Sequence, residues 1–526
     1  MLGYKLQEIL ANSSEACNIS ADAVLRANRA HAAPVLVVLD DDPTGTQSIA
    51  NLPVLTSWSV ADFEWAFQLG APAVYVLTNS RSLAPAEAAQ INREVVRAAY
   101  SAAGSTKISF VSRGDSTLRG HFPLEPETLA GAVREHTGTE IDATVIVPAF
   151  PDAGRITVNS VHYAANKAGE FVPVGETDYA QDATFGYENS DLAAWVAEKT
   201  RGKVAAADVI RIQLSELRHA GGAAVLELLR GAQRGAVIVA DCVTESDLRS
   251  LALALNTAEK EGKNFIYRVG PPFVRARLGM DPPPPCDAAQ LRAIFDAQSQ
   301  ALPHGLIVVG SHVELTSRQL AHLQNSCDLA RFELDVRRVL GVGRDEYLVQ
   351  LATSVSDALR HGEAVIATSR ELVRGTDGQS SLEIARRVSA AMVEVVNKIV
   401  HRNPPKFVIA KGGITSSDTA SLGLEIRRAQ VIGPMLPGLV SLWVSASGVA
   451  ANVPYIVFAG NVGDESSLSE VVAKLQDAAG GAVADAAGTA SAAVVATAAT
   501  AIGTVASATN PAGAAYPVAD STGSVS

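Results

Sequence analysis

The chain has 526 residues, more than a single hydrophobic core usually holds, so two or more domains are expected. Hydrophobic residues make up 48% and charged residues 19%, a composition typical of a folded globular protein. The net charge of −12 argues against a nucleic-acid-binding protein, because phosphate backbones require a basic surface.

The beginning and the end of the chain carry few functional signals. The first 20 residues lack the basic stretch and apolar block of a signal peptide, and no apolar run of about 20 residues predicts a membrane span before the tail. The four cysteines are scattered without a CxxC motif, as is usual in a reducing cytoplasm. We therefore expect a cytoplasmic protein without nucleic-acid or membrane partners, and we consider a homodimer as one assembly.

Short runs rich in Val, Ile and Leu alternate with longer segments of helical periodicity. The runs lie at 34–40, 73–80, 107–115, 143–150, 235–242, 264–269, 305–312, 363–369, 405–413 and 454–463. Continuously apolar runs are typical of strands buried on both faces. Helical segments such as 85–102 and 378–400 lie between them. The alternation predicts an α/β fold of two Rossmann-like domains, each with a mostly parallel sheet flanked by helices.

A proline-rich stretch, "GPPFVRARLGMDPPPPCDA", interrupts this alternation at 270–288. Four consecutive prolines cannot continue a helix or a central strand. We therefore place an N-terminal domain at 1–270, a linker at 271–300 and a C-terminal domain at 301–478. A low-complexity tail rich in Ala and Gly follows at 479–526.

Chemically suggestive residues gather where the predicted strands end. They are Asp40 to Asp42, Asn79 to Arg81, Arg113 to Ser116, Pro148 to Arg155, Gly310 to His312, Lys411 to Gly413 and Gly460 to Gly463. In open parallel sheets, ligands bind beyond the carboxyl ends of the strands. The pattern therefore predicts ligand sites at these ends.

The first of these stretches, "LDDDPTGTQ", crowds three carboxylates after a strand. Asp40, Asp42 and Thr44 match the DxDxT motif of haloacid-dehalogenase-like phosphatases, in which one Asp attacks phosphorus and Mg²⁺ holds the phosphate. The acidic loop that this chemistry also needs has only a distant candidate at Asp464–Glu465. A simple Asx turn would explain the Pro and the Gly, but not three carboxylates.

Two further motifs suggest anion binding. In "SRGDSTLRGH", Arg113 and Arg119 flank Asp115, and guanidinium groups pair well with carboxylates and phosphates. Arg81 and Arg155 add positive charge at other strand ends. In "VIAKGGITSSDTA", two glycines precede a predicted helix start, where backbone N–H groups can approach phosphates.

With these motifs in view, the chain resembles the four-carbon acid sugar kinase family, which includes D-threonate and 3-oxo-tetronate kinases. The matching blocks are "DDDPTGTQ", "TNSRSL", "RGDSTLRGH", "VPAFPDAGRITVNSVHY", "GSHVELTSRQL", "AKGGITSSDT" and "AGNVG". The resemblance implies an N-terminal domain that binds a sugar acid, a C-terminal domain that binds ATP with Mg²⁺, and phosphate transfer to a terminal hydroxyl in the cleft between them.

The resemblance also implies residue roles. Sugar-acid contacts would come from Asp41, Arg81, Arg113, Ser116, Thr117, Arg119 and Arg155, and nucleotide contacts from Ser311, Gly412, Gly413, Thr415, Gly460 and Asn461. Asp42 and Asp115 are the catalytic candidates, and either could deprotonate the hydroxyl. The arginines would hold the substrate carboxylate.

The sequence departs from the family pattern at two blocks. The loop reads "SRGDSTLRGH", where D-threonate kinases tend to carry Lys before the Asp and Asn after the last Gly, and "FAGNVG" lacks the usual Lys-Ser. These departures leave D-threonate, D-erythronate, 3-oxo-tetronate and a branched acid such as 3-oxo-isoapionate as candidate substrates. A phosphatase and a non-catalytic sugar-acid-binding protein remain alternatives.

Overall fold

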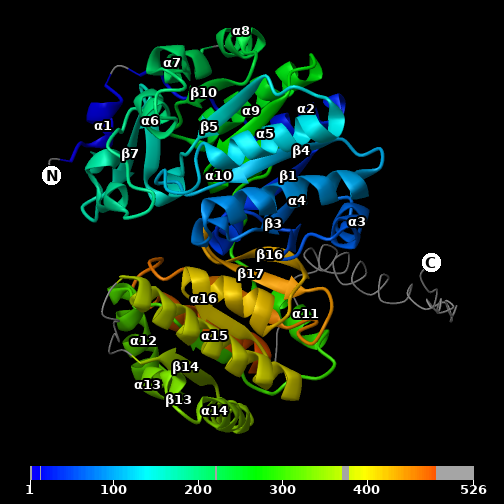
Figure 1. Cartoon of the computed structure of the whole chain (residues 1–526), viewed down its shortest axis with the longest axis vertical. Helices are drawn as coiled ribbons and strands as arrows, with labels where there is room; N and C mark the ends of the chain where they lie inside the picture. Colours follow the sequence, from blue (N-terminus) through cyan, green and yellow to red (C-terminus); the bar gives the residue numbers. More distant parts are fainter. Residues whose placement is uncertain (1–2, 12, 220–221, 370–377, 481–526) are drawn as a thin grey trace, which may run out of the picture. The chain divides into compact units, whose positions relative to one another are not determined.

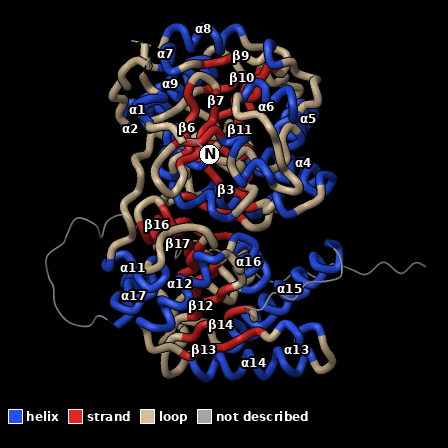
Figure 2. Tube along the Cα trace, turned by 90° about the vertical axis from the view of Figure 1, so that its left-hand side faces the viewer, coloured by secondary structure: helices blue, strands red, loops and turns tan. Residues whose placement is uncertain are grey.

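One long mixed sheet forms the centre of the structure, a computed structural model that describes residues 3–480 except 12, 220–221 and 370–377. Its strand order is β13-β14-β12-β15-β18-β17-β16-β2-β3-β1-β4-β11-β5-β10-β9. Figures 1 and 2 show helices on both faces of these strands. Of the predicted tail at 479–526, residues 481–526 lie outside the described residues.

The N-terminal part of this sheet is parallel throughout. Its strands are β1 (Val35–Asp40), β2 (Leu52–Leu55), β3 (Ala73–Leu77), β4 (Ile108–Arg113), β5 (Ala143–Val147), β9 (Ile210–Ile212), β10 (Ala236–Ala240) and β11 (Phe265–Val269). The carboxyl ends of β1, β3, β4 and β11 are neighbours, so residues that follow these strands meet at one edge.

The C-terminal part is a second parallel set. It contains β12 (Leu306–Val309), β13 (Ala330–Leu334), β14 (Ala364–Thr368), β15 (Val408–Lys411) and β18 (Pro454–Phe458). Two antiparallel strands, β16 (Arg428–Leu436) and β17 (Leu439–Ser445), join it to β2 of the first set. Figure 2 shows β16 and β17 at this junction.

Helices cover the faces of both sets. In the N-terminal part they are α1 (Leu6–Ile9), α2 (Ala21–His31), α3 (Val60–Gln68), α4 (Pro85–Ala103), α5 (Leu124–Thr137), α6 (Leu192–Lys199), α7 (Leu214–Leu217), α8 (Ala223–Gly231), α9 (Glu245–Lys260) and α10 (Pro271–Leu278). Then come α11 (Ala288–Asp296), α12 (Glu314–Ser326), α13 (Val336–Leu340), α14 (Arg344–Ala358), α15 (Gly378–Arg402), α16 (Gly413–Asp418) and α17 (Ser467–Gly480). A separate antiparallel sheet of β6 (Arg155–Val158), β7 (Val161–Ala165) and β8 (Phe171–Pro173) follows β5.

The strand residues supply the core on both faces of the sheet. In β1, the side chains of Leu36 and Val38 belong to one apolar cluster, and those of Val37 and Leu39 to another. This two-sided burial explains why the strand sequences are continuously apolar. The predicted α/β fold with a mostly parallel sheet is confirmed.

The predicted linker at 271–300 contains more regular structure than its proline content suggested. Pro271–Leu278 forms helix α10, in which every residue is buried, and 288–296 forms α11. Two prolines are tolerated in α10 because they occupy its first turn, where backbone N–H groups need no helical partner. The domain boundaries of 1–270 and 301–478 stay a proposal.

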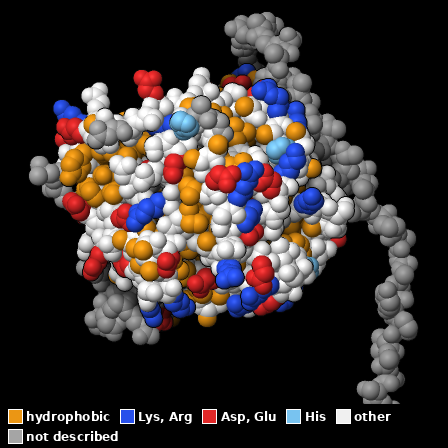
Figure 3. Space-filling model, turned by 90° about the horizontal axis from the view of Figure 1, so that it is seen from above, with side chains coloured by type: hydrophobic (Ala, Val, Ile, Leu, Met, Phe, Trp, Pro, Cys, Tyr) orange, Lys and Arg blue, Asp and Glu red, His pale blue; other side chains and the backbone are white. Residues whose placement is uncertain are grey.

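None of the helices that the structure describes is long and apolar enough to cross a membrane. On the face in Figure 3, basic and acidic side chains lie next to one another, and the described residues form no extended basic area there.

Candidate functional site

Two of the three aspartates after β1 are neutralised by arginines from neighbouring strands. Asp40 is buried and forms an ion pair with Arg113, the last residue of β4. Asp41 is also buried and accepts two hydrogen bonds from Arg81, from Nε at 3.1 Å and Nη2 at 2.7 Å. Like charge is tolerated here because a guanidinium group from each side pairs with it.

The third aspartate, Asp42, has a different role. Its Oδ1 caps the 3₁₀ helix η1 (Pro43–Ser48) by accepting hydrogen bonds from the backbone N–H of Thr44 at 2.9 Å and from the Thr44 hydroxyl at 2.6 Å. Its Oδ2 faces Gly413 at the start of α16: a Cβ atom placed on Gly413 would lie 3.2 Å from it. Asp42 is therefore where the N-terminal and C-terminal clusters of predicted site residues meet.

The helix η1 holds Asp42 in this position by docking on β17. Thr46 lies in the middle of η1, and its hydroxyl accepts a hydrogen bond from the indole N–H of Trp443 at 2.9 Å. The same hydroxyl donates to Ser441 Oγ at 2.8 Å. These groups are buried, so the bonds fix the position of η1 against the C-terminal half.

The loop after β4 is a second cluster, centred on Asp115. The carboxylate accepts hydrogen bonds from Arg119 Nε at 2.6 Å and from the Thr117 hydroxyl. Burial alone would raise the pKa of Asp115, but the guanidinium groups of Arg81 and Arg119 hold it well below its usual range. Asp115 is therefore a firmly ionised side chain and a weak base.

Buried side chains support the backbone of this loop. His162 Nε2 lies 2.8 Å from the carbonyl oxygen of Ser116, and the Tyr187 hydroxyl donates to the carbonyl of Thr117 at 2.7 Å. Burial lowers the pKa of His162 to about 4, so it is neutral at pH 7 and donates from Nε2. Ser116 and Thr117 are buried and lie within the loop rather than on its surface.

Arg155 reaches the same edge from β6. Its guanidinium lies 5.9 Å from the centroid of the Tyr179 ring, and Nη2 donates to the Tyr179 hydroxyl at 3.3 Å. Arg119 lies over the same ring at 5.3 Å. Tyr179 thus brings two partly accessible cations together next to Asp115.

Two site residues escaped the sequence analysis. Arg268 on β11 is buried, and a Cβ on Gly114 would overlap its guanidinium, which donates to the carbonyl of Arg119 at 3.0 Å. Glu125 on α5 is buried and accepts hydrogen bonds from Ser80 at 2.5 Å and Ser112 at 3.2 Å. The sequence gives only weak signals for these two residues. Arg268 is a single Arg inside the apolar run "NFIYRV", and Glu125 lies eleven residues after the start of the loop that follows β4.

The electrostatics of this edge depend on Asp41. Burial raises the pKa of Asp41 to about 6, although Arg81 and Arg268 both oppose the rise. Burial also lowers the pKa of Arg113 to about 9, and nearby Arg268 contributes to that decrease. Taking up one proton at Asp41 would make the cluster more positive and more favourable to an anion.

In the C-terminal half, three strand ends converge on glycines. A Cβ on Gly310 would overlap Thr415, one on Gly460 would lie 2.5 Å from Ser311 Oγ, and one on Gly412 would lie 3.2 Å from Ser311 Cβ. Gly412 also has a φ of 130°, which only glycine adopts easily. The glycines in the turns after β12, β15 and β18 therefore pack closely against the side chains of Ser311 and Thr415. We call this the glycine cradle.

A buried lysine, Lys411, lies at the base of the glycine cradle. Its ammonium donates to the carbonyl oxygen of Ala459 at 2.6 Å and lies 3.8 Å from the centroid of the Phe458 ring. Burial lowers the pKa of Lys411 to about 7. A buried ammonium group next to glycine turns is a suitable partner for a phosphate. Lys411 lies at one of the strand ends where ligand sites were expected, but no local motif indicated a role for its side chain.

The structure thus gathers the predicted residues into two clusters. The first cluster contains Asp41, Asp42, Arg81, Arg113, Asp115, Ser116, Thr117, Arg119 and Arg155. The second cluster contains Ser311, Gly412, Gly413, Thr415 and Gly460. Asn461 follows the cradle, is exposed and makes no hydrogen bond to another described residue. The described residues contain no group of three or more His, Cys, Asp or Glu side chains that could hold a metal ion.

Two family models match the chain. One is described as a sugar-binding N-terminal domain and matches residues 36–277, and the other as a nucleotide-binding C-terminal domain and matches residues 306–468. Together they contain both clusters.

Two solved bacterial structures illustrate the likeness in fold. One is a Haemophilus influenzae protein of the family DUF1537, with 19% identity and a TM-score of 0.55. The other is a Salmonella typhimurium LT2 protein provisionally described as a tRNA synthase, with 18% identity and a TM-score of 0.59. Each alignment covers 83% of this chain and 98% of the other. At these identities the likeness concerns the fold alone, and no curated protein matches the chain.

Proposed function

Since the chain belongs to the four-carbon acid sugar kinase family, we propose that it is an ATP-dependent kinase that phosphorylates the terminal hydroxyl of a four-carbon or branched sugar acid. The matches to a sugar-binding and a nucleotide-binding domain support an enzyme with two small-molecule ligands. D-threonate, D-erythronate, 3-oxo-tetronate and 3-oxo-isoapionate are the candidate substrates.

The observation that carries this proposal is the position of Asp42. Its Oδ2 faces Gly413 of the glycine cradle, while Oδ1 is held by the cap of η1. A phosphoryl group bound at the cradle and a hydroxyl bound beside Arg81 would therefore both lie near one carboxylate. Phosphoryl transfer depends mainly on such positioning and on charge neutralisation.

For the sugar acid, we propose that Arg119 and Arg155 bind the carboxylate. Both are partly accessible and both contact Tyr179, so they form a prearranged pair of cations. Arg81 Nη1 lies 3.8 Å from Asp42 Oδ2. Arg81 would contact the part of the substrate that lies between the carboxylate-binding arginines and Asp42. Arg113 is only 2% exposed and is occupied by Asp40, so we assign it a supporting role.

For the nucleotide, we propose that the glycine cradle and Lys411 bind the ATP phosphates. The cradle offers backbone groups together with the hydroxyls of Ser311 and Thr415, and Lys411 offers a buried ammonium group. Mg²⁺ would arrive with the ATP phosphates and keep several of its waters, so we assign it no protein ligand and leave Asp42 to the hydroxyl. When bound, Mg²⁺ neutralises charge on the phosphate oxygens.

Between the two candidate bases, we propose Asp42 for the hydroxyl and Asp115 for positioning Arg119. The pKa of Asp115 is held low by two guanidinium groups, and its Oδ2 already accepts two hydrogen bonds. Asp42 is more accessible, with 21% of its side chain exposed, and its Oδ2 faces the cradle. A base needs access to the proton that it removes.

An ATP-consumption screen tests the proposed function. The purified protein is incubated with Mg-ATP and each of D-threonate, D-erythronate, L-threonate, 3-oxo-tetronate and 3-oxo-isoapionate, and ADP and the phosphorylated acid are measured. We expect ADP formation that depends on one of these acids. Binding of an acid without ADP formation would instead indicate a non-catalytic binding protein.

The phosphatase alternative finds little support in the structure. A haloacid-dehalogenase-like mechanism requires the first aspartate, Asp40, as a nucleophile, but Asp40 is buried and paired with Arg113. Release of inorganic phosphate from sugar phosphates without ATP, lost in an Asp40→Asn variant, would restore that alternative.

A further inference from the structure

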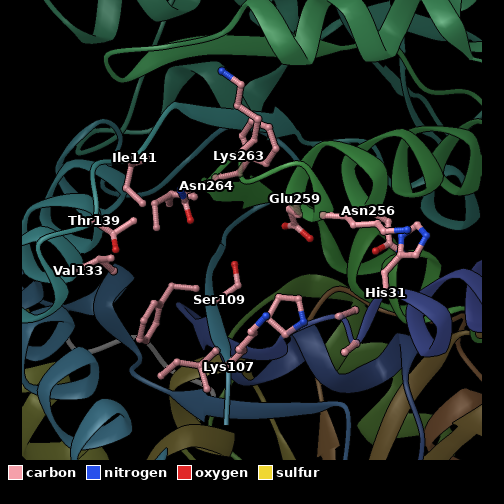
Figure 4. Close-up of a pocket in the computed structure, with 18 of the residues that line it drawn as sticks. His31, Lys107, Ser109, Val133, Thr139, Ile141, Asn256, Glu259, Lys263 and Asn264 are labelled. Carbon is pink, nitrogen blue, oxygen red and sulfur yellow. The ribbon is translucent and has the colours of Figure 1, made fainter. Parts of the chain in front are cut away.

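A second pocket lies at the opposite ends of the strands that carry the sugar-acid cluster. It has a volume of about 490 Å³, within the range of roughly 300–1,000 Å³ that small-molecule sites occupy. The amino-terminal residues of β4 and β11, among them Ser109 and Phe265, line it. Figure 4 shows Thr139 and Val133 across this pocket from Glu259 and Asn256.

The charge of the pocket is positive. Lys107, Lys260 and Lys263 line it, and the ammonium groups of Lys107 and Lys260 form no hydrogen bond or ion pair with any described residue. Lys263 is already paired: its ammonium donates to the carbonyl of Ala232 at 2.7 Å and forms an ion pair with Asp142 at 3.5 Å. Two unpaired cations at one pocket favour a ligand with a negative charge.

The one carboxylate in the pocket wall does not cancel this charge. Glu259 forms an ion pair with the buried Arg277 and accepts a hydrogen bond from the Tyr267 hydroxyl. Asn28 accepts hydrogen bonds from Arg277 Nη1 at 2.9 Å and from Asn256 Nδ2 at 2.8 Å. The carboxylate of Glu259 is therefore already paired within this network, although Arg277 Nε has no hydrogen-bond partner among the described residues, and it does not neutralise Lys107 or Lys260.

Part of the remaining wall is apolar. Its apolar side chains are Tyr100, Phe110, Val133, Ile141 and Ile266, and they lie among polar residues such as Ser109 and Thr139. Apolar side chains combined with a few polar groups are typical of sites for small organic molecules, and they would contact a carbon skeleton rather than a bare inorganic ion.

From this combination we infer that the pocket is a second ligand site, which binds a small organic anion through Lys107 and Lys260 with its carbon skeleton against Tyr100, Val133 and Ile141. Carboxylate and phosphate groups share the required chemistry. The site is separate from the sugar-acid cluster, because Arg113 and Arg268 lie at the other ends of the same two strands.

Binding of two probe anions tests the inference. Phenyl phosphate and benzoate are titrated into the full-length protein and followed by calorimetry and by saturation-transfer NMR, with benzyl alcohol as the uncharged comparison. We expect at least one anion to bind and benzyl alcohol to bind at least about tenfold more weakly, since one charge-assisted contact is lost. The two anions distinguish a phosphate site from a carboxylate site.

Variants locate the binding. We expect Lys107→Gln/Lys260→Gln to weaken the anion at least about tenfold. Thr139→Trp, which keeps both lysines but fills the pocket, should weaken it similarly. Lys167→Gln/Lys203→Gln removes two exposed lysines elsewhere and should leave binding unchanged, as should Arg81→Gln in the sugar-acid cluster. Absence of binding by both anions, or binding that the first double variant and Thr139→Trp both retain, would overturn the inference.

Discussion

The carboxylate of Asp42 lies against Gly413, close enough that a Cβ on this glycine would be 3.2 Å from Oδ2. The two residues are 371 positions apart and belong to the two regions matched by the sugar-binding and nucleotide-binding models. A contact of this kind can be probed from both sides, by changing the carboxylate and by changing the glycine.

Replacing Asp42 by Asn should remove the charge and keep the local fold. Asn caps helices about as well as Asp, so η1 and its hydrogen bond from Thr44 should persist. We expect kcat to fall about 10²–10⁴-fold if Asp42 is the base, with little change in melting temperature. Steady-state kinetics and thermal unfolding check this. Asp142→Asn, at a distant carboxylate, is the control, and an Asp42→Asn enzyme with normal kcat would contradict the assignment.

Adding one methyl group at Gly413 should disturb Asp42 without removing any polar group. The backbone of Gly413 does not have a positive φ, so Ala is tolerated by the chain, but its Cβ would press on the carboxylate. We expect Gly413→Ala to lower kcat by about tenfold or more while the protein stays folded. Gly131→Ala is the matched control because Gly131 lies in α5 with no atom near its added Cβ, and Ala there should stabilise by about 0.5–1 kcal/mol. Equal kcat values for Gly413→Ala and Gly131→Ala would contradict this prediction.

Asp115 should affect substrate binding more than the chemical step. In Asp115→Asn the short ion pair with Arg119 is lost and the longer one of Arg119 with Asp182, at 3.7 Å, remains, so Arg119 is held less firmly beside Tyr179. We expect KM for the sugar acid to rise about tenfold and kcat to change by less than about threefold. Arg119→Lys should produce the same split, since Lys cannot reproduce the guanidinium geometry. The assignment of the two aspartates would be reversed by a large loss of kcat in Asp115→Asn together with a normal kcat in Asp42→Asn.

Nucleotide binding should take up a proton at Lys411. Burial lowers the pKa of this ammonium to about 7, so it is mostly neutral at pH 8 in the free protein. A phosphate favours the charged form and raises the pKa again, so Mg-ATP binding at pH 8 should be accompanied by proton uptake that is absent at pH 6. Calorimetry in buffers of different ionisation enthalpy measures this uptake.

Two variants and a control identify the group that takes up the proton. Lys411→Met should abolish the uptake and weaken Mg-ATP, whereas Lys411→Arg keeps a charge that does not titrate and should abolish the uptake with a smaller loss of affinity. Lys398→Met, on α15, should behave like the unmodified protein. Proton uptake that persists in Lys411→Met would show that another group titrates.

Much of the fold could be predicted from local sequence patterns. All ten apolar runs form strands, for example β1 within 34–40 and β14 within 363–369, because strands buried on both faces must be apolar along their length. Helices α4 and α15 match the periodic segments at 85–102 and 378–400. The hairpin of β16 and β17 was missed because it mixes Gly, Pro, Ser and apolar residues without a clear period.

The same contrast holds for the candidate site. Asp42, Arg81 and Arg119 could be found because they follow strands in recognisable motifs. Arg268 and Glu125 could not, since their importance comes from burial against a glycine loop and against Ser80 and Ser112, and not from any local pattern.

By itself, the sequence determined that this is an α/β protein with polar residues at the strand ends and family motifs for a sugar acid and a nucleotide. Only the tertiary structure decided which contacts each of the three aspartates makes. Asp40 and Asp41 pair with Arg113 and Arg81, and Asp42 reaches Gly413. The physical reason is that charge pairing and burial depend on which strand ends become neighbours, and residues distant along the chain fix that arrangement through packing.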